Sequence, residues 1–212
     1  MEAQELQTLH LININPSNPE QHPNTMTSRS LLPFVLSLLL PRIIMAQSYL
    51  ELYSHQWLNN WKSLHLLNEL GGQFPLHCLK ESMNFKLPAE MLHPHQFQQE
   101  NATEAIHDLL QQIFNIFSRN HSQTGWDEAI VEKFLHGVHQ EMVWLELFLE
   151  EEMGWENSTL RRDISLHIKS YFKRMMDYLK GRNYSSCAWE VIRMETKRSC
   201  LVIYRLTRKL KK

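Results

Sequence analysis

The stretch VEKFLHGVHQEMVWLELFL, residues 131–149, decides the fold of this chain. Apolar residues recur in it at alternating steps of four and three, at Val131, Leu135, Val138, Met142, Leu145 and Leu149. Residues three and four apart share one face of an α-helix, so this repeat is typical of a helix packed along a bundle seam. We therefore predict a helix over about residues 126–152 inside an all-α bundle.

Four further segments have helical periodicity, at about residues 49–70, 96–119, 159–180 and 186–209. In the first of these helices we expect an inward stripe of Leu50, Tyr53, Trp57, Trp61, Leu64, Leu67 and Leu70. The chain has only 6 glycines and 8 prolines in 212 residues, which favours long helices over a sheet punctuated by turns. The fold class predicted is a bundle of five helices.

The lengths of two connections constrain the topology. Residues 181–185 form a short link, so the last two helices are expected to be antiparallel neighbours. Residues 73–95 form a much longer link than the two to eight residues usual in bundles. A link of this length permits a crossover between parallel helices, but the pattern alone leaves both up-up-down-down and up-down order open.

The N-terminal part of the chain reads differently from the bundle. Residues 1–25 are polar and contain three prolines, which indicates a non-structural extension. Residues 26–46 have a basic start at Arg29, an apolar run over 31–40 and a small residue at Ala46, which is typical of a secretory signal peptide. A short buried helix is the alternative. The bundle is then residues 47–212, a secreted, extracellular domain, and the absence of an uninterrupted apolar run of 18 residues predicts no membrane insertion.

The chain has three cysteines, Cys78, Cys187 and Cys200. Thirteen residues of helix separate the last two by about 20 Å. A disulfide needs Cα atoms within about 7 Å, so these two cannot bridge each other. Secretion makes a disulfide the expected use of two cysteines, and the third is left over.

Four Asn-x-Ser/Thr sequons are candidate sites of N-glycosylation, at Asn101, Asn120, Asn157 and Asn183. No motif for catalysis or phosphate binding is found, so we predict neither enzyme activity nor a cofactor. The twelve histidines include His136 and His139 one helical turn apart, but no ligand pattern is completed and we predict no metal site. The basic residues 205–212 suit a helix end. A heparin-like polyanion is a second interpretation, and secretion disfavours nucleic acid.

Five segments resemble the type I interferon family, in the same order and spacing across residues 48–212. They are CLKESMNFKLP (78–88), LLQQIFNIFSRN (109–120), TGWDEAIVEKFL (124–135), YFKRMMDYLK (171–180) and YSSCAWEVIRMETKRS (184–199). TGWDEAIVE and IYRLTRKL are similar to the beta-like branch. The resemblance implies a helical cytokine bundle with up-up-down-down order and a long first crossover loop. It also implies a disulfide between Cys78 and Cys187, which would close a loop of about 110 residues and contribute about 4–5 kcal/mol.

The resemblance further implies a secreted cytokine that binds both chains of the heterodimeric type I interferon receptor and induces antiviral signalling. The higher-affinity chain would contact Leu79 and Lys80 in the first loop and Arg193, Met194, Lys197 and Arg198 on the last helix. The four helix positions would share one outward face. The lower-affinity chain would contact Lys169 and Arg174. A solvated basic face is the alternative interpretation of these charges.

Ser82 stands where the family usually has an arginine that contacts the receptor. This departure keeps a second function open, that of a secreted decoy or weak agonist of the same receptor. A helical carrier of an apolar ligand is a third. We expect a monomer, with a dimer through an intermolecular disulfide of the odd cysteine, Cys200, as the alternative.

Overall fold

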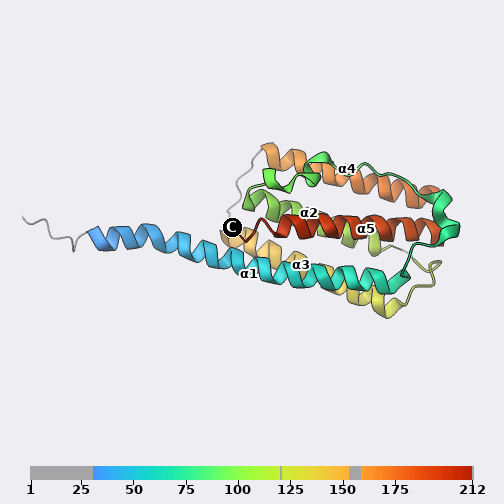
Figure 1. Cartoon of the computed structure of the whole chain (residues 1–212), viewed down its shortest axis with the longest axis horizontal. Coiled ribbons are helices and arrows are strands. Elements are labelled where there is room, and N and C mark those ends of the chain that lie inside the picture. Colours follow the sequence, from blue (N-terminus) through green and yellow to red (C-terminus); the bar gives the residue numbers. More distant parts are fainter. Residues whose placement is uncertain (1–30, 120, 153–158, 212) are drawn as a thin grey trace, which may run out of the picture. The chain divides into compact units, whose positions relative to one another are not determined.

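The computed structural model describes residues 31–119, 121–152 and 159–211. The contacts divide the chain into Met1–Leu39 and Leu40–Lys212, and the bundle belongs to the second unit. The described helices are α1 (Leu31–Gly71), which begins in the first unit, and α2 (Gln99–Phe117), α3 (Glu128–Glu152), α4 (Thr159–Gly181) and α5 (Ser186–Thr207), which lie in the second (Figure 1). Short 3-10 turns η2 (Leu76–Glu81), η3 (Ala89–Leu92) and η4 (Pro94–Gln96) interrupt the first long connection. The described residues contain no strand, so the all-α prediction is confirmed.

Helix α1 begins at Leu31, well before the predicted start near residue 49. Residues 31–46 are rich in leucine and isoleucine and contain no glycine, and Pro33 lies in the first turn, where its missing N–H breaks no helical hydrogen bond. The predicted signal peptide of residues 26–46 overlaps this helix and stays a prediction. The predicted extension of residues 1–25 lies outside the described residues. Within the described residues, no helix is apolar over enough length to span a bilayer.

Local signals fix the helix ends that matter for the site. Gly71 ends α1, and Gly72 follows in the left-handed region with φ +59°. The Asp127 carboxylate accepts a hydrogen bond from the Ala129 amide at 2.9 Å, at the start of α3. The Ser185 hydroxyl accepts one from the Ala188 amide at 3.3 Å and caps α5.

Contacts along the helices show their relative directions. The side chain of Asn60 donates to the carbonyl of Cys200, and Lys211 lies over the ring of Tyr53, so α1 and α5 are antiparallel. Helix α2 is also antiparallel to α5, because Gln99 reaches Leu210 at one end and Phe117 meets Trp189 at the other. Helices α1 and α2 therefore run parallel.

Helix α3 runs against α2, with His107 bonded to Glu146 and Phe117 packed on Phe134. Helices α1 and α2 therefore point up, and α3 and α5 point down. These four helices have the up-up-down-down order, with a long first crossover between α1 and α2. Helix α4 is the additional helix and packs antiparallel to α5.

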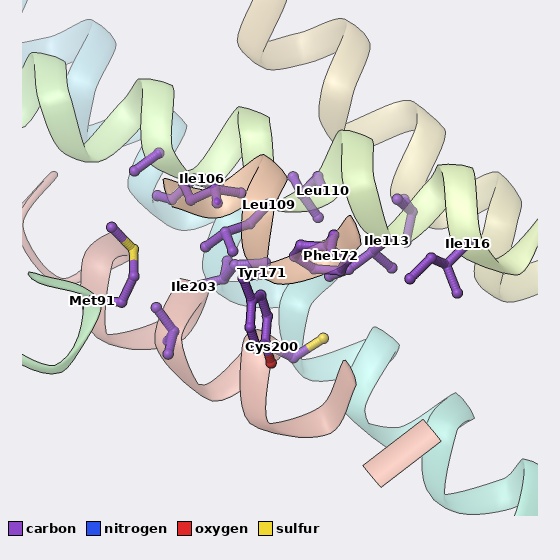
Figure 2. Packing of buried hydrophobic residues seen from close by; sticks show 14 of the residues in the cluster. Met91, Ile106, Leu109, Leu110, Ile113, Ile116, Tyr171, Phe172, Cys200 and Ile203 are labelled. Carbon is purple, nitrogen blue, oxygen red and sulfur yellow. The ribbon is translucent and has the colours of Figure 1, made fainter. Parts of the chain in front are cut away.

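The core includes apolar residues at helical spacing on α2, α4 and α5 (Figure 2). Helix α2 buries Ile106, Leu110, Ile113 and Phe117, and α4 buries Ile168, Tyr171, Met175 and Leu179. Trp189 of α5 is fully buried as well.

The inward faces of α3 and α1 differ from the prediction by one residue. Helix α3 buries Val131, Phe134, Val138, Glu141, Leu145 and Phe148. The prediction is therefore confirmed at Val131, Val138 and Leu145 and is one residue too late at the other three positions. Helix α1 buries Tyr49, Leu52, Gln56, Asn60, Ser63, Leu67 and Leu70, and exposes Leu50, Trp57 and Trp61. The middle of α1 therefore turns polar side chains inward and tryptophans outward.

Candidate functional site

A disulfide ties the first long connection to the last helix. Cys78 in η2 and Cys187 in the first turn of α5 are joined, with Cα atoms 5.1 Å apart and a sequence separation of 109. This is the pairing that the resemblance implies. The bridge holds η2 against the start of α5, which lies far from it in sequence.

Leu79 and Lys80 directly follow the bridged cysteine in η2. The side chain of Leu79 is 56% exposed, and Lys80 is exposed beside it. Ser82 is also exposed, at the C-terminal end of η2. An exposed leucine on a segment held by a disulfide is a rigid apolar contact point.

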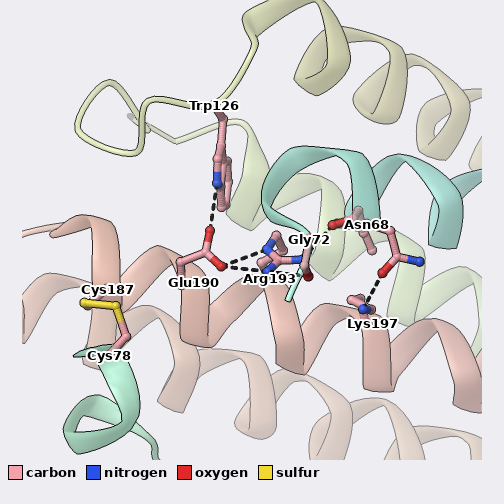
Figure 3. A network of polar contacts seen from close by, with 9 residues as sticks. Asn68, Gly72, Cys78, Trp126, Cys187, Glu190, Arg193 and Lys197 are labelled. Atoms are coloured by element: carbon pink, nitrogen blue, oxygen red, sulfur yellow. Dashed lines mark hydrogen bonds and ion pairs between the residues drawn. A yellow bond between two sulfur atoms is a disulfide. The ribbon is translucent and has the colours of Figure 1, made fainter. Parts of the chain in front are cut away.

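The prediction that Arg193 faces outward is wrong. Its side chain is 0% exposed and lies in a polar network between α5 and the end of α1 (Figure 3). Its guanidinium donates to Glu190 Oε2 through Nη2 at 2.7 Å and through Nε at 3.1 Å. The same group donates to the carbonyl oxygens of Leu67 at 2.8 Å and Gly72 at 3.2 Å. Arg193 is therefore a clamp on the last turn of α1 rather than an exposed contact.

Two neighbours complete this clamp. The indole of Trp126 donates to the other oxygen of Glu190, Oε1, at 3.0 Å and attaches the segment before α3 to the network. A Cβ added to Gly71 would lie 2.6 Å from Arg193 Nε, closer than such atoms approach. The guanidinium fits because residue 71 has no side chain.

The other predicted positions of α5 lie toward solvent. Arg198 is exposed and pairs with Glu195 at 3.4 Å, and Met194 is half-buried. The ammonium of Lys197 donates to the side-chain oxygen of Asn68 on α1. Burial, and then the nearby Arg193 charge, lower the pKa of Lys197. Met194, Lys197 and Arg198 thus form a half-open surface above the buried clamp.

Sequence reasoning missed four exposed apolar residues near this surface. Trp57 and Trp61 on α1 are 43% and 59% exposed, and Leu201 and Tyr204 on α5 are 48% and 39% exposed. The Asn60 bond to Cys200 brings these parts of the two helices together. The tryptophans sit at i and i+4, which suggested the core. Asn60 and Ser63 on the opposite face are the signal that the register was ambiguous.

Arg174 and Lys169 have different environments on α4. Arg174 donates through Nε to the Phe85 carbonyl at 2.9 Å and through Nη2 to the Lys86 carbonyl at 3.1 Å. It therefore holds the first connection onto α4, and it borders an open pocket with a volume of about 280 Å³ that Lys86 and His167 also line. Lys169 is exposed and available for contact.

Cys200 is buried, at 1% exposed. Burial, and then the Glu141 carboxylate, raise the pKa of its thiol well above the usual range. A protonated, enclosed thiol cannot reach a second molecule without opening the bundle, which argues against the alternative of a disulfide-linked dimer.

Glu141 on α3 belongs to the same buried layer. It is 0% exposed, and its two carboxylate oxygens have no hydrogen-bond partner. Burial raises its pKa to about 8, and the opposing effect of Lys62 is smaller. The carboxyl group is therefore largely protonated at neutral pH.

Two of the four sequon asparagines lie among the described residues. Asn183 is exposed in the turn before α5, and Asn101 is half-buried on α2. Asn120 and Asn157 lie outside the described residues. Across the described ranges the one close group of metal-ligand side chains is His77 with Cys78 and Cys187, and the disulfide occupies both sulfurs.

Comparison with known proteins identifies the family. The model of the interferon alpha/beta domain matches residues 52–210. Human interferon beta is 39% identical over 183 residues, which cover 86% of this chain and 97% of that protein. Pig interferon epsilon is 36% identical over 188 residues, covering 88% and 97%. The beta and epsilon relatives are similarly close, so the beta-like branch stays a prediction.

A solved structure supports the fold. Zebrafish interferon 1 superposes with a TM-score of 0.65 at 21% sequence identity, covering 76% of this chain and 99% of that one. The matched domain spans most of the bundle, including η2, the clamp and α5. This chain belongs to the type I interferon family, whose members are cytokines and not enzymes.

Proposed function

We propose that the chain is a secreted ligand of the two-chain type I interferon receptor and induces antiviral signalling. The observation that carries this proposal is the surface formed by η2 and α5. The disulfide and the Arg193 clamp hold its backbone, while Leu79, Lys80, Met194, Lys197 and Arg198 remain open to a partner. Preorganised surfaces of this kind bind tightly because little conformational entropy is lost on association.

The composition of this surface also suits a protein partner. Exposed tryptophan, tyrosine, methionine and arginine are enriched at interfaces. Trp57 and Trp61 extend the surface from α5 across to α1. We assign the higher-affinity receptor chain to this face and place Lys169 of α4 at the lower-affinity chain. Arg174 supports the second face indirectly, through its hold on the first connection.

The rival functions have less support. An apolar-ligand carrier needs an enclosed apolar cavity, whereas the pocket beside Arg174 is open and is lined by Lys86, Glu90 and His167. A decoy would fold and bind but not signal, which a cellular assay resolves. Purified residues 47–212 should activate an interferon-stimulated reporter at nanomolar concentration in cells of the matching species. Receptor binding without a reporter response would favour the decoy.

The double variant Met194→Glu, Arg198→Glu should weaken binding to the isolated higher-affinity chain at least tenfold, which corresponds to about 1.4 kcal/mol. Both positions lie above the clamp. The substitutions replace an apolar side chain and a positive side chain with negative charges. Surface plasmon resonance measures the loss. The matched control is Lys133→Glu, an exposed charge reversal on α3. Equal losses in both variants would place the interface elsewhere.

We also propose that the domain is exported through the leader of residues 26–46 and glycosylated at Asn183. Asn183 is exposed, has a backbone φ of +49° and lies in a turn where an enzyme can reach it. Asn183→Gln should reduce the mass of protein secreted from mammalian cells by one glycan. Ser185→Thr is the control, because it preserves both the sequon and a hydroxyl cap for α5. An unchanged mass in Asn183→Gln would show that the site is unused.

A further inference from the structure

The C-terminal end of the chain carries an unbalanced positive charge. Residues 197–212 contain seven lysines and arginines and no acidic residue, although the whole chain has a net charge of −1. The cations come in two groups, Lys197 with Arg198 in the middle of α5, and Arg205 with the basic residues that follow it. They span about 20 Å along the helix axis.

The two groups differ in how their charges are satisfied. In the middle of α5, Lys197 bonds to Asn68 and Arg198 pairs with Glu195. Arg205 and Arg208 are exposed, and across the described parts of the chain neither has a carboxylate partner. Lys211 is exposed and lies over the ring of Tyr53. The second group is therefore a cluster of cations without a carboxylate partner among the described residues, which we call the α5 end cluster (Arg205, Arg208, Lys209 and Lys211).

The helix dipole accounts for only part of this charge. Cations in the last turn of a helix stabilise it by about 0.3–1 kcal/mol each, and the effect falls off within that turn. Arg208, Lys209 and Lys211 lie beyond the last helical residue, Thr207. Four cations held together without counter-charges repel one another, and a bound polyanion would relieve that repulsion.

The geometry points to a linear polyanion as the partner, and we propose that the α5 end cluster binds sulfated glycosaminoglycan. Arginine pairs with sulfate in the same two-pronged way as with carboxylate and phosphate. Exposed Leu201 and Tyr204 lie between the two cationic groups and offer an apolar edge beside Arg205. A secreted chain meets sulfated glycosaminoglycans at cell surfaces, whereas most nucleic acid lies inside cells.

This cluster is separate from the proposed receptor surface. Helices α1 and α5 are antiparallel, so Lys211 lies beside Tyr53 near the start of the described bundle, while Arg193 clamps the far end of α1. The disulfide is at the Arg193 end. Glycan binding at the cluster does not depend on receptor binding at the other end.

The test measures binding of the glycosylated, disulfide-bonded chain to immobilised heparin at about 150 mM salt. Arg205→Gln, Arg208→Gln should lose at least tenfold in affinity and should show a shallower dependence on salt, because fewer counterions are released. The control, Lys133→Gln, Lys180→Gln, removes the same charge from exposed positions on α3 and α4 and should change affinity less than twofold. Reporter activity should survive in both double variants, which separates this site from the receptor surface.

Three results would overturn the proposal. Equal losses of heparin affinity in the two double variants would show that binding depends on net charge and not on the α5 end cluster. An unchanged affinity in Arg205→Gln, Arg208→Gln would show that the cluster does not bind heparin. Equal affinity for desulfated heparin, for a DNA duplex, or for phosphatidylserine vesicles would assign the charge to another polyanion or to a membrane. A thermal melt of each variant confirms that the bundle is folded.

Discussion

Replacing Arg193 with methionine is expected to lower the free energy of unfolding by about 3–5 kcal/mol, the cost of breaking a buried ion pair from one side. Glu190 would keep its charge next to the core with only the Trp126 indole as a partner. The carbonyl oxygens of Leu67 and Gly72 would lose their donor at the end of α1. Urea denaturation of the oxidised domain measures the change.

The double variant Glu190→Gln, Arg193→Met separates charge from packing. It removes both charges and leaves an amide that still accepts from Trp126, so part of the lost stability should return. Arg198→Met is the control, because that arginine is exposed and its pair with Glu195 contributes little. If Arg193→Met proves as mild as Arg198→Met, the clamp does not stabilise α1.

The second large effect concerns pH. Glu141 has a pKa of about 8 in the folded bundle against 4.5 in the unfolded chain. Below about pH 4.5 both states hold the proton, and between 4.5 and 8 only the folded state does, so folding must take up a proton. The free energy of unfolding should therefore fall as pH rises through this window and level off above pH 8. At about 1.4 kcal/mol per pKa unit, the total loss is about 4–5 kcal/mol.

Denaturation curves at pH 5, 6.5 and 8 test this dependence. Glu141→Gln should remove most of the slope, since its amide does not titrate. The nearby groups that titrate or carry charge are Lys62 on α1 and Cys200 on α5, and both are unchanged in the variant. Glu132→Gln, at an exposed position on the same helix, should keep the slope. Identical slopes in the parent and Glu141→Gln would contradict a buried protonated carboxyl.

Apart from the start of α1, the positions of the helices followed from the sequence, but the inward faces of α1 and α3 did not. Helix α3 has apolar pairs at Phe134–Leu135 and Phe148–Leu149, so a seam can be drawn through either member of each pair. The pattern favoured the seam through Met142, because the other passes through Glu141. The folded helix buries the seam through Glu141, because that seam places Phe134 and Phe148 in the core. The Glu141 carboxyl group is accommodated there in its protonated form. Tertiary packing therefore outweighed the polarity of one residue.

Arg193 shows a different limit. An arginine in a run of charges on a helix suggests a solvated or receptor-facing side chain. Its burial depends on two carbonyl groups more than 120 residues away and on the missing side chain of Gly71. The local pattern of α5 contains none of these partners. The disulfide pairing, in contrast, followed from the resemblance to the family and is present in the structure.

The antiparallel pairing of α1 and α5 has a practical consequence for protein engineering. Lys211 lies over the ring of Tyr53, so a fusion partner joined beyond it would start away from the Cys78–Cys187 bridge and the surface around Met194. A reporter or half-life extension domain attached there should leave receptor recognition intact while masking the basic residues that follow Thr207. An insertion in the turn at residues 182–185 would instead lie next to Cys187 and is expected to obstruct the proposed receptor surface.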